Sequence, residues 1–258
     1  MVGCDEEEGA VRPMNTDGVE GAGSAEDGDQ AISGSQVVEG LNVLHLFGDA
    51  DANFDPELAT ARVKQAADRG TDVLTVATLG HRCEVAVMAL DRDLLNLRRL
   101  QLELRRSGLI FTDSFFSITE VSEYARNITE ERKRPRLYPK LPPKGKDAWC
   151  FYPMSKRRNV QQNWYSLEFQ ERERLMGEHG SSGRKFAGRV TQLVTGATGV
   201  SDWEWGVTLF ARHPDDLKDV VYTMRYDEAS ATYAEFGPFY VGILQEPEQV
   251  FGSLVTGA

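Results

Sequence analysis

Two stretches in the second half of the chain carry the side chains best suited to chemistry. In the first, His179 follows Leu175 by four residues and Met176 by three, so a helix would place it beside two inward-pointing apolar side chains. A half-buried imidazole of this kind suits a metal or haem ligand. The residues alone favour another interpretation, because a histidine in the last turn before Gly180 stabilises the negative end of a helix and the glycine caps it.

The second stretch is Phe-Tyr-Pro-Met-Ser-Lys-Arg-Arg at residues 151–158. Tyr152 and Met154 share one face of a predicted strand, and Pro153 is expected to end regular pairing, so that Tyr152 sits at a strand end near Lys156. A phenol and an ammonium group at a strand end are typical of a functional site. An interior tyrosine followed by a basic surface turn explains the same residues equally well. Glycine-rich phosphate loops, His-Glu-x-x-His and Gly-x-Ser-x-Gly do not occur in the sequence.

The elements that must position these residues follow from the hydrophobic period, which alternates between two and 3.6 residues. In the first half the predicted order is strand 41–47, helix 55–69, weak strand 73–77, strand 83–90, helix 91–106 and strand 114–123. In the second half it is strand 148–154, helix 167–179, strand 187–194, strand 203–211, helix 214–225 and strand 235–243. Both halves therefore have the order βαββαβ, which predicts an α+β fold of two ferredoxin-like units.

Charge and composition divide the chain into four segments. The net charge is -11, yet residues 1–34 hold nine acidic residues, one basic residue and no Leu, Phe, Tyr or Trp. Residues 1–36 are therefore predicted to be a disordered, solubilising acidic tail. A basic, proline-rich loop at 125–147, with net charge +5, connects an N-terminal half at 37–124 to a C-terminal half at 148–258. So long a loop is expected to be a lid, a binding loop or a linker.

Composition also excludes several classes of protein. No window approaches the ~18 consecutive apolar residues of a membrane span, and the first residues lack the apolar core of a secretory signal. We therefore expect a cytoplasmic protein, whose cysteines Cys4, Cys83 and Cys150 are free thiols. A nucleic-acid partner is not expected, because no aromatic platform or helix-turn-helix pattern accompanies the basic residues.

Several blocks, in order along residues 110–245, resemble the coproheme decarboxylases of the chlorite dismutase superfamily. The blocks are Arg136-Leu137-Tyr138-Pro139, the Tyr-Pro-Met-Ser-Lys run at Tyr152, residues 176–184 around His179, Asp202-Trp203-Glu204-Trp205-Gly206, and residues 224–242. The resemblance implies a dimeric α+β barrel formed by the two halves, a homopentamer, and a porphyrin in the C-terminal half. It also implies that hydrogen peroxide converts two propionates of Fe-coproporphyrin III (coproheme), which is both substrate and redox cofactor, into vinyl groups, giving haem b.

The same resemblance implies roles for individual residues. His179 resembles the proximal iron ligand, in place of the helix-cap interpretation, and Gln192 the distal residue. Tyr152 resembles the tyrosine that is oxidised to a radical, and Lys156 the cation that orients substrate and tyrosine. The remaining substrate contacts carry over to Arg136, Met154, Arg225 and Ser230.

Two alternatives stay open. The first is a chlorite dismutase-like haem enzyme. That family carries a distal arginine where this chain has Gln192, and its members lack the Tyr-Pro-Met-Ser-Lys run. A non-enzymatic haem-binding protein would need His179 and an apolar face but not Tyr152.

Overall fold

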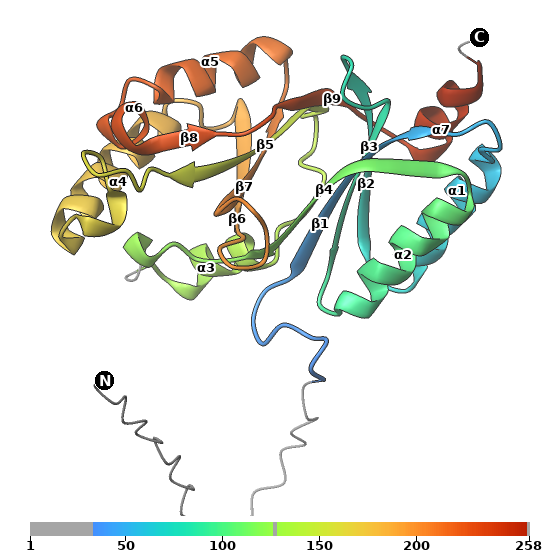
Figure 1. Ribbon diagram of the computed structural model, residues 1–258, viewed down its shortest axis with the longest axis horizontal. Helices are drawn as coiled ribbons and strands as arrows, with labels where there is room; N and C mark the ends of the chain where they lie inside the picture. The colour runs from blue at the N-terminus through green and yellow to red at the C-terminus, as the bar shows by residue number, and fades with distance from the viewer. Residues whose placement is uncertain (1–32, 126–127, 257–258) are drawn as a thin grey trace, which may run out of the picture. The chain divides into compact units, whose positions relative to one another are not determined.

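The computed structural model describes residues 33–125 and 128–256 of the chain (Figure 1). Most of the predicted acidic tail, residues 1–32, lies outside the described residues, and so does Cys4. Cys83 and Cys150 are buried and free, as predicted. Among the helices of the described residues, none is both long enough and apolar enough to span a lipid bilayer.

The first half has the predicted order βαββαβ. Its elements are β1 (Asn42–Ala50), α1 (Pro56–Asp68), β2 (Asp72–Leu79), β3 (Val85–Asp91), α2 (Leu94–Arg106) and β4 (Leu109–Thr119). As predicted, Asp55 caps helix α1, where its side chain accepts a hydrogen bond of 2.8 Å from the backbone of Leu58. Helix α2 starts later than predicted because Asp93, not Asp91, is its capping residue.

The second half contains more elements than predicted. They are β5 (Ala148–Lys156), α4 (Phe169–Arg184), β6 (Val190–Gly196), β7 (Trp205–Ala211), α5 (Pro214–Met224), α6 (Glu228–Tyr233), β8 (Ala234–Phe236), β9 (Tyr240–Gln245) and α7 (Pro247–Thr256). The last predicted strand is in fact two strands, β8 and β9, because Gly237 and Pro238 interrupt it. Gly237 is packed so closely against Trp203 that an added Cβ would lie 2.9 Å from the indole ring.

The basic segment at 125–147 is not a continuous loop, contrary to the prediction. Helix α3 (Glu130–Leu137) lies within it, with Pro135 in its last turn. Acidic residues at its start and basic residues at its end match the helix dipole, and Leu137 is buried. The proline and the high charge hid this short helix from the hydrophobic pattern.

The strands form one antiparallel nine-stranded sheet in the order β7-β6-β4-β1-β3-β2-β9-β5-β8. Strand β5 also pairs with β7, so each of the eight strands from β7 to β5 is paired along both of its edges. One sheet face buries a core that includes Phe47, Trp149, Phe151 and Phe210. The other face is covered by helices, with α1, α2 and α7 over the first half and α5 over β5 and β7 (Figure 1).

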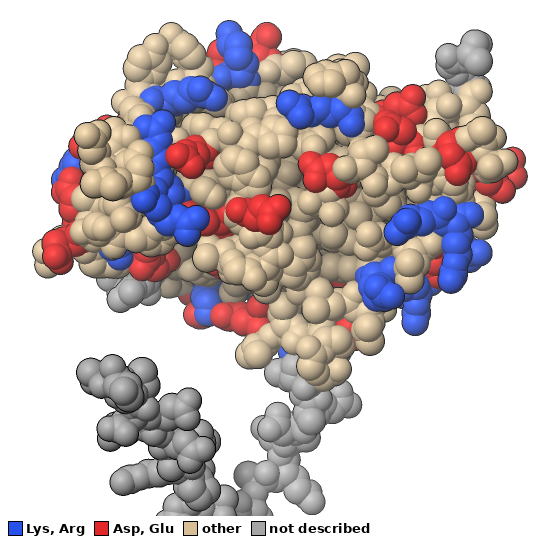
Figure 2. All heavy atoms as spheres, viewed as in Figure 1, with Lys and Arg blue, Asp and Glu red and all other residues tan. Residues whose placement is uncertain are grey.

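Acidic and basic side chains lie side by side on the face shown in Figure 2. Ion pairs of the described residues include Lys64 with Glu248 and Arg69 with Glu103. Exposed pairs of this kind contribute little to stability, so the apolar clusters on the two sheet faces hold the fold together.

Candidate functional site

Strand β5 carries Tyr152, Met154 and Lys156, whose alternation places all three on one sheet face. Pro153 was predicted to end the pairing, but the strand continues through it to Lys156, and Tyr152 lies in the strand interior. The Pro153 carbonyl accepts a hydrogen bond of 2.8 Å from the backbone of Gly237, so the proline nitrogen faces the same side. On that side of β5 lies the gap between β8 and β9. The missing N–H of the proline therefore removes no hydrogen bond between strands.

Tyr152 lies in an aromatic and aliphatic environment and is only 6% exposed. Its ring stacks on Phe239 with centroids 4.6 Å apart and contacts Phe236 at 5.7 Å. Burial, with a smaller effect of Cys150, raises the pKa of the phenol far above its ordinary value, although the positive charge of Arg225 opposes this. Among the described residues no hydrogen-bond partner meets its hydroxyl. The phenol is therefore protonated at neutral pH, and it makes no hydrogen bond to the described residues.

Met154 and Arg225 lie beside this aromatic group. Met154 packs against the same apolar cluster as Tyr152. Arg225 follows the last residue of α5, and its guanidinium lies 4.8 Å from the centre of the Phe236 ring. The arginine side chain is exposed, so it presents a cation at the border of the cluster that holds the phenol.

Lys156 is a buried cation, 6% exposed. Its Nζ donates a hydrogen bond of 3.0 Å to the carbonyl of Ala229 on α6 and lies 4.3 Å from the Trp164 ring centre. Burial lowers the pKa of Lys156 to about 8, and the charges of Asp227 and Glu204 act in the opposite direction. The ammonium group is therefore mostly charged at pH 7 but loses its proton more easily than an ordinary lysine.

His179 projects from helix α4 towards the start of α6. Its Nδ1 lies 3.0 Å from Oδ2 of Asp227 and 3.3 Å from Oγ of Ser230. Its Nε2 makes no hydrogen bond to the described residues, so that nitrogen is free to bind a ligand. As predicted, Leu175 on the same helix face is buried, at 1% exposure, and it packs against Ala229.

The helix-cap interpretation of His179 is wrong. Helix α4 continues past Gly180 to Arg184, so the histidine lies inside the helix and not in its last turn. The φ angle of Gly180 is not positive, so this residue lacks the left-handed conformation of a capping glycine.

Asp227 holds His179 in place and was not identified from the sequence. Its side chain caps α6 by accepting a hydrogen bond of 2.9 Å from the Ser230 backbone. Burial alone would raise the pKa of Asp227, but the hydrogen bond and charge of His179, with the bonds from Ser230, outweigh it and lower the pKa. The position of Asp227 before Glu-Ala-Ser is a capping signal, yet nothing in the local sequence shows that the same carboxylate reaches His179.

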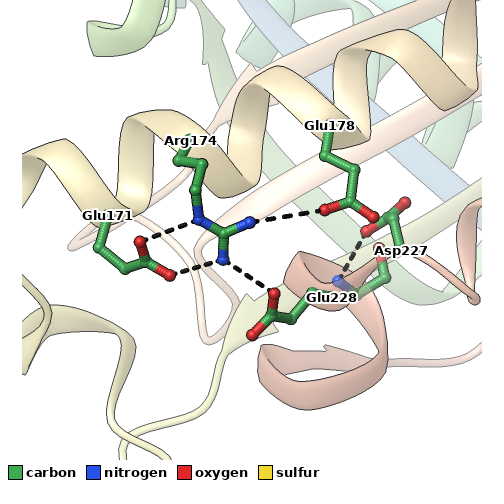
Figure 3. Close-up of polar contacts among 6 residues, drawn as sticks. Glu171, Arg174, Glu178, Asp227 and Glu228 are labelled. Atoms are coloured by element: carbon green, nitrogen blue, oxygen red, sulfur yellow. Dashed lines mark hydrogen bonds and ion pairs between the residues drawn. The ribbon is translucent and has the colours of Figure 1, made fainter.

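An arginine on α4 forms an ion pair with a residue of α6 near the histidine (Figure 3). Arg174 donates two hydrogen bonds, of 2.9 and 2.6 Å, to Glu171 and one of 2.8 Å to Glu228. Glu178 lies 3.9 Å from the same guanidinium. Glu228 is the residue after Asp227, so this arrangement helps to fix the start of α6 against α4.

Gln192 and Arg136 lie on other elements. Gln192 is an exposed residue of β6 that pairs with Leu209 of β7, which in turn pairs with Cys150 of β5. Cross-strand partners share a face, so Gln192 lies on the sheet face that carries Tyr152. Arg136 is an exposed residue of α3 that donates a hydrogen bond of 3.0 Å to the carbonyl of Arg132.

The structure thus brings most of the predicted residues together. Those around β5, the end of α5, α4 and α6 are Tyr152, Met154, Lys156, His179, Arg225 and Ser230. Gln192 shares their sheet face, whereas no described contact joins Arg136 to them. Asp227, Glu204 and Trp164 complete the surroundings of His179 and Lys156, and sequence reasoning assigned no role to them.

Comparison with known proteins gives one family and several relatives. The family described as chlorite dismutase matches residues 56–245. A coproheme decarboxylase of Staphylococcus carnosus is 40% identical over 212 residues, which cover 78% of this chain and 81% of that protein. A longer relative from Natronomonas pharaonis is 37% identical over 243 residues, covering 82% of this chain but only 40% of that protein.

A similar solved structure is that of a novel haem-binding protein from Thermus thermophilus. It superimposes with a TM-score of 0.76 at 36% identity, covering 84% of this chain and 96% of that chain.

Proposed function

Because the chain belongs to the chlorite dismutase family, we propose that it is a coproheme decarboxylase, which makes haem b from Fe-coproporphyrin III with hydrogen peroxide. The observation that carries the proposal is the 40% identity to the Staphylococcus carnosus enzyme over 78% of this chain. The geometry supports it, because a buried phenol, a buried ammonium group and a carboxylate-held histidine lie on or beside β5 and α6.

His179 is the residue that would hold the iron of a bound porphyrin. Asp227 accepts the Nδ1 proton, which leaves the Nε2 lone pair for the metal, and metal-binding histidines commonly have such a carboxylate partner. Bound coproheme supplies the iron and the redox chemistry with peroxide. Gln192 would lie near the peroxide, where its amide can donate and accept hydrogen bonds but cannot act as a general base.

Tyr152 would carry the hydrogen transfer. Its raised pKa keeps the phenol protonated, so oxidation removes an electron and a proton together, and the resulting radical takes a hydrogen atom from a propionate carbon. Each propionate loses carbon dioxide, one proton and two electrons and becomes a vinyl group. Each peroxide takes up two electrons and two protons and becomes two molecules of water, so two peroxides balance two vinyl groups.

Cationic and polar side chains would orient the propionates. Lys156 lies four residues beyond Tyr152 on β5, and Arg225 follows the end of α5 beside the Phe236 ring that Tyr152 contacts. A hydrogen bond to a charged group contributes about 1.5 to 3 kcal/mol. Ser230 and Met154 complete this set. Arg136 on the basic α3 segment would bind a further propionate, and that segment would act as a lid over an anionic ligand. Orientation matters because Tyr152 can take hydrogen only from a propionate within reach.

The finer architecture belongs to the same proposal. Residues 37–124 and 148–258 would be two ferredoxin-like halves of a dimeric α+β barrel, in which the closed ring of strand pairings from β7 to β5 is the barrel wall. The protein would assemble as a homopentamer. Light scattering of the purified protein tests this assembly, and a monomer would contradict it.

The decisive experiment mixes the purified protein with coproheme, adds hydrogen peroxide in steps and follows the porphyrin by mass spectrometry. We expect two successive losses of carbon dioxide and haem b as the product. Coproheme that binds but keeps all four propionates would contradict the proposal and favour a non-enzymatic haem-binding protein. Oxygen release from added chlorite, without decarboxylation, would favour the chlorite dismutase activity instead.

A further inference from the structure

Two exposed tyrosines lie next to the residues that hold His179. Tyr222 is 60% exposed and Tyr226 is 73% exposed, and both line a surface hollow of about 340 Å³ between α4 and the end of α5. Asp227 lines the same hollow. These two large, exposed rings at the end of a surface helix have no packing role in the core.

The hollow connects to the candidate iron ligand through a short path. Tyr226 directly precedes Asp227 in the chain, and the Asp227 carboxylate lies 3.0 Å from Nδ1 of His179. The Asp227 side chain is only 1% exposed. The covalent chain therefore leads from an exposed tyrosine, through one peptide bond, to a buried carboxylate that contacts the imidazole.

The two tyrosine side chains contact each other through both their hydroxyls and their rings. Their hydroxyls are 2.8 Å apart, and their rings form an edge-on pair with centroids 5.2 Å apart. Tyr222 lies in the last turn of α5 and Tyr226 in the turn that follows the helix, and this turn brings the two rings together. Phe could make the same ring contact. The hydroxyls add a chemical property, because a phenol at the surface can release its proton to water when it loses an electron.

We propose that Tyr222 and Tyr226 are oxidised when hydrogen peroxide reacts and no propionate lies within reach of Tyr152. The pair then acts as a surface outlet for the oxidising equivalents. This inference rests on the proposed function, in which His179 binds the iron. Each phenol passes one electron inward and releases its proton to water. One hydrogen peroxide and two phenols thus give two waters and two phenoxyl radicals, which can join through a carbon–carbon bond between the rings.

The outlet would protect the porphyrin and the residues around it. Haem b, the product, has lost the two reactive propionates, so peroxide that meets the product-bound protein has no decarboxylation to drive. The oxidising equivalents must then go elsewhere, and oxidation of a surface pair is less damaging than oxidation of Met154 or of the ring itself.

The test loads the full chain with haem b and adds hydrogen peroxide. In the wild type we expect a tyrosyl radical signal in freeze-quenched samples and a cross-linked or oxidised peptide containing residues 222 and 226. In the Tyr222→Phe/Tyr226→Phe double variant we expect that signal to be lost, with oxidation moving to Met154 and its neighbours and the Soret band bleaching severalfold faster per peroxide. Tyr138→Phe is the control, since Tyr138 is exposed but lies at the end of α3.

A parallel sample with coproheme separates the inference from the proposed function. If the wild type makes haem b while residues 222 and 226 remain unmodified and the double variant bleaches at the wild-type rate, the outlet is refuted and the decarboxylase is not. If the wild type does not bind the porphyrin, both are refuted. The two side chains are exposed and Phe preserves the ring contact, so the double variant should fold as the wild type does.

Discussion

The carboxylate of Asp227 lies 3.0 Å from Nδ1 of His179, on a side chain that is only 1% exposed. A buried carboxylate is costly unless its oxygens are hydrogen-bonded, and here His179 and Ser230 supply the bonds. Because these bonds lower the pKa of Asp227, the group stays charged at neutral pH and orients the imidazole.

Replacing Asp227 with Asn should weaken the hold on iron. The variant loses the negative charge that makes the imidazole a stronger donor, and loss of such a partner costs about 10- to 100-fold in metal affinity or activity. We expect coproheme titrations followed at the Soret band to show this loss, and the reduction potential of the bound haem to rise. Glu228→Gln is the matched control, because that exposed neighbour contacts Arg174 and not His179. Equal affinity and potential in both variants would remove Asp227 from the site.

The Tyr152→Phe variant should separate binding from chemistry. The Tyr152 hydroxyl has no hydrogen-bond partner among the described residues, so its removal leaves no buried group unsatisfied, and the free energy of unfolding should change by no more than about 0.5 kcal/mol. The variant should bind coproheme as the wild type does but yield no vinyl product in mass spectrometry. Full turnover would exclude the tyrosine from the mechanism.

Regular patterns in the sequence predict much of this fold. The apolar period of Leu217, Val220 and Val221 behind Pro214 identifies α5, and Asp55 with Pro56 identifies the start of α1. Three features were missed or misplaced. Pro153 is tolerated inside β5 only because the partner strand breaks beside it, Gly180 stays helical, and α3 lies in a segment of very low hydropathy.

The site was only partly predictable for the same reason. His179, Tyr152 and Lys156 have recognisable local patterns, and the resemblance to a known family located the other predicted residues. Asp227 and Glu204 act on residues 48 positions away in the chain, at Nδ1 of His179 and the backbone of Lys156 respectively. Such pairings follow from how α6 and β7 are placed in space, and local periodicity carries no information about that placement.

Lys156 should make stability and substrate binding respond to pH in opposite directions. Its pKa is about 8 in the folded protein and 10.5 as an ordinary lysine, so the unfolded chain binds more protons between these values. The contribution of Lys156 to stability therefore increases as the pH rises from about 8 to 10.5, and Lys156→Met should remove that increase. Urea unfolding at several pH values measures the effect.

In the same pH range, coproheme affinity should fall in the wild type, because the ammonium group that would face a propionate loses its charge. A bound carboxylate would raise the pKa of Lys156, so the fall should begin above pH 8. Lys156→Arg, which keeps its charge, is the control for the affinity measurement. An affinity in the wild type that is constant up to pH 10 would show that Lys156 does not contact the substrate.

Arg174 tests whether the exposed contacts between α4 and α6 matter. Its three carboxylate partners compete for one guanidinium that is half exposed, so their effects cannot simply add. We expect Arg174→Ala to lower the melting temperature by no more than about 4 °C, and high salt to abolish the difference by screening the pairs. A much larger, salt-independent loss would mean that this arginine, rather than the buried contact of Leu175 with Ala229, holds His179 against Asp227.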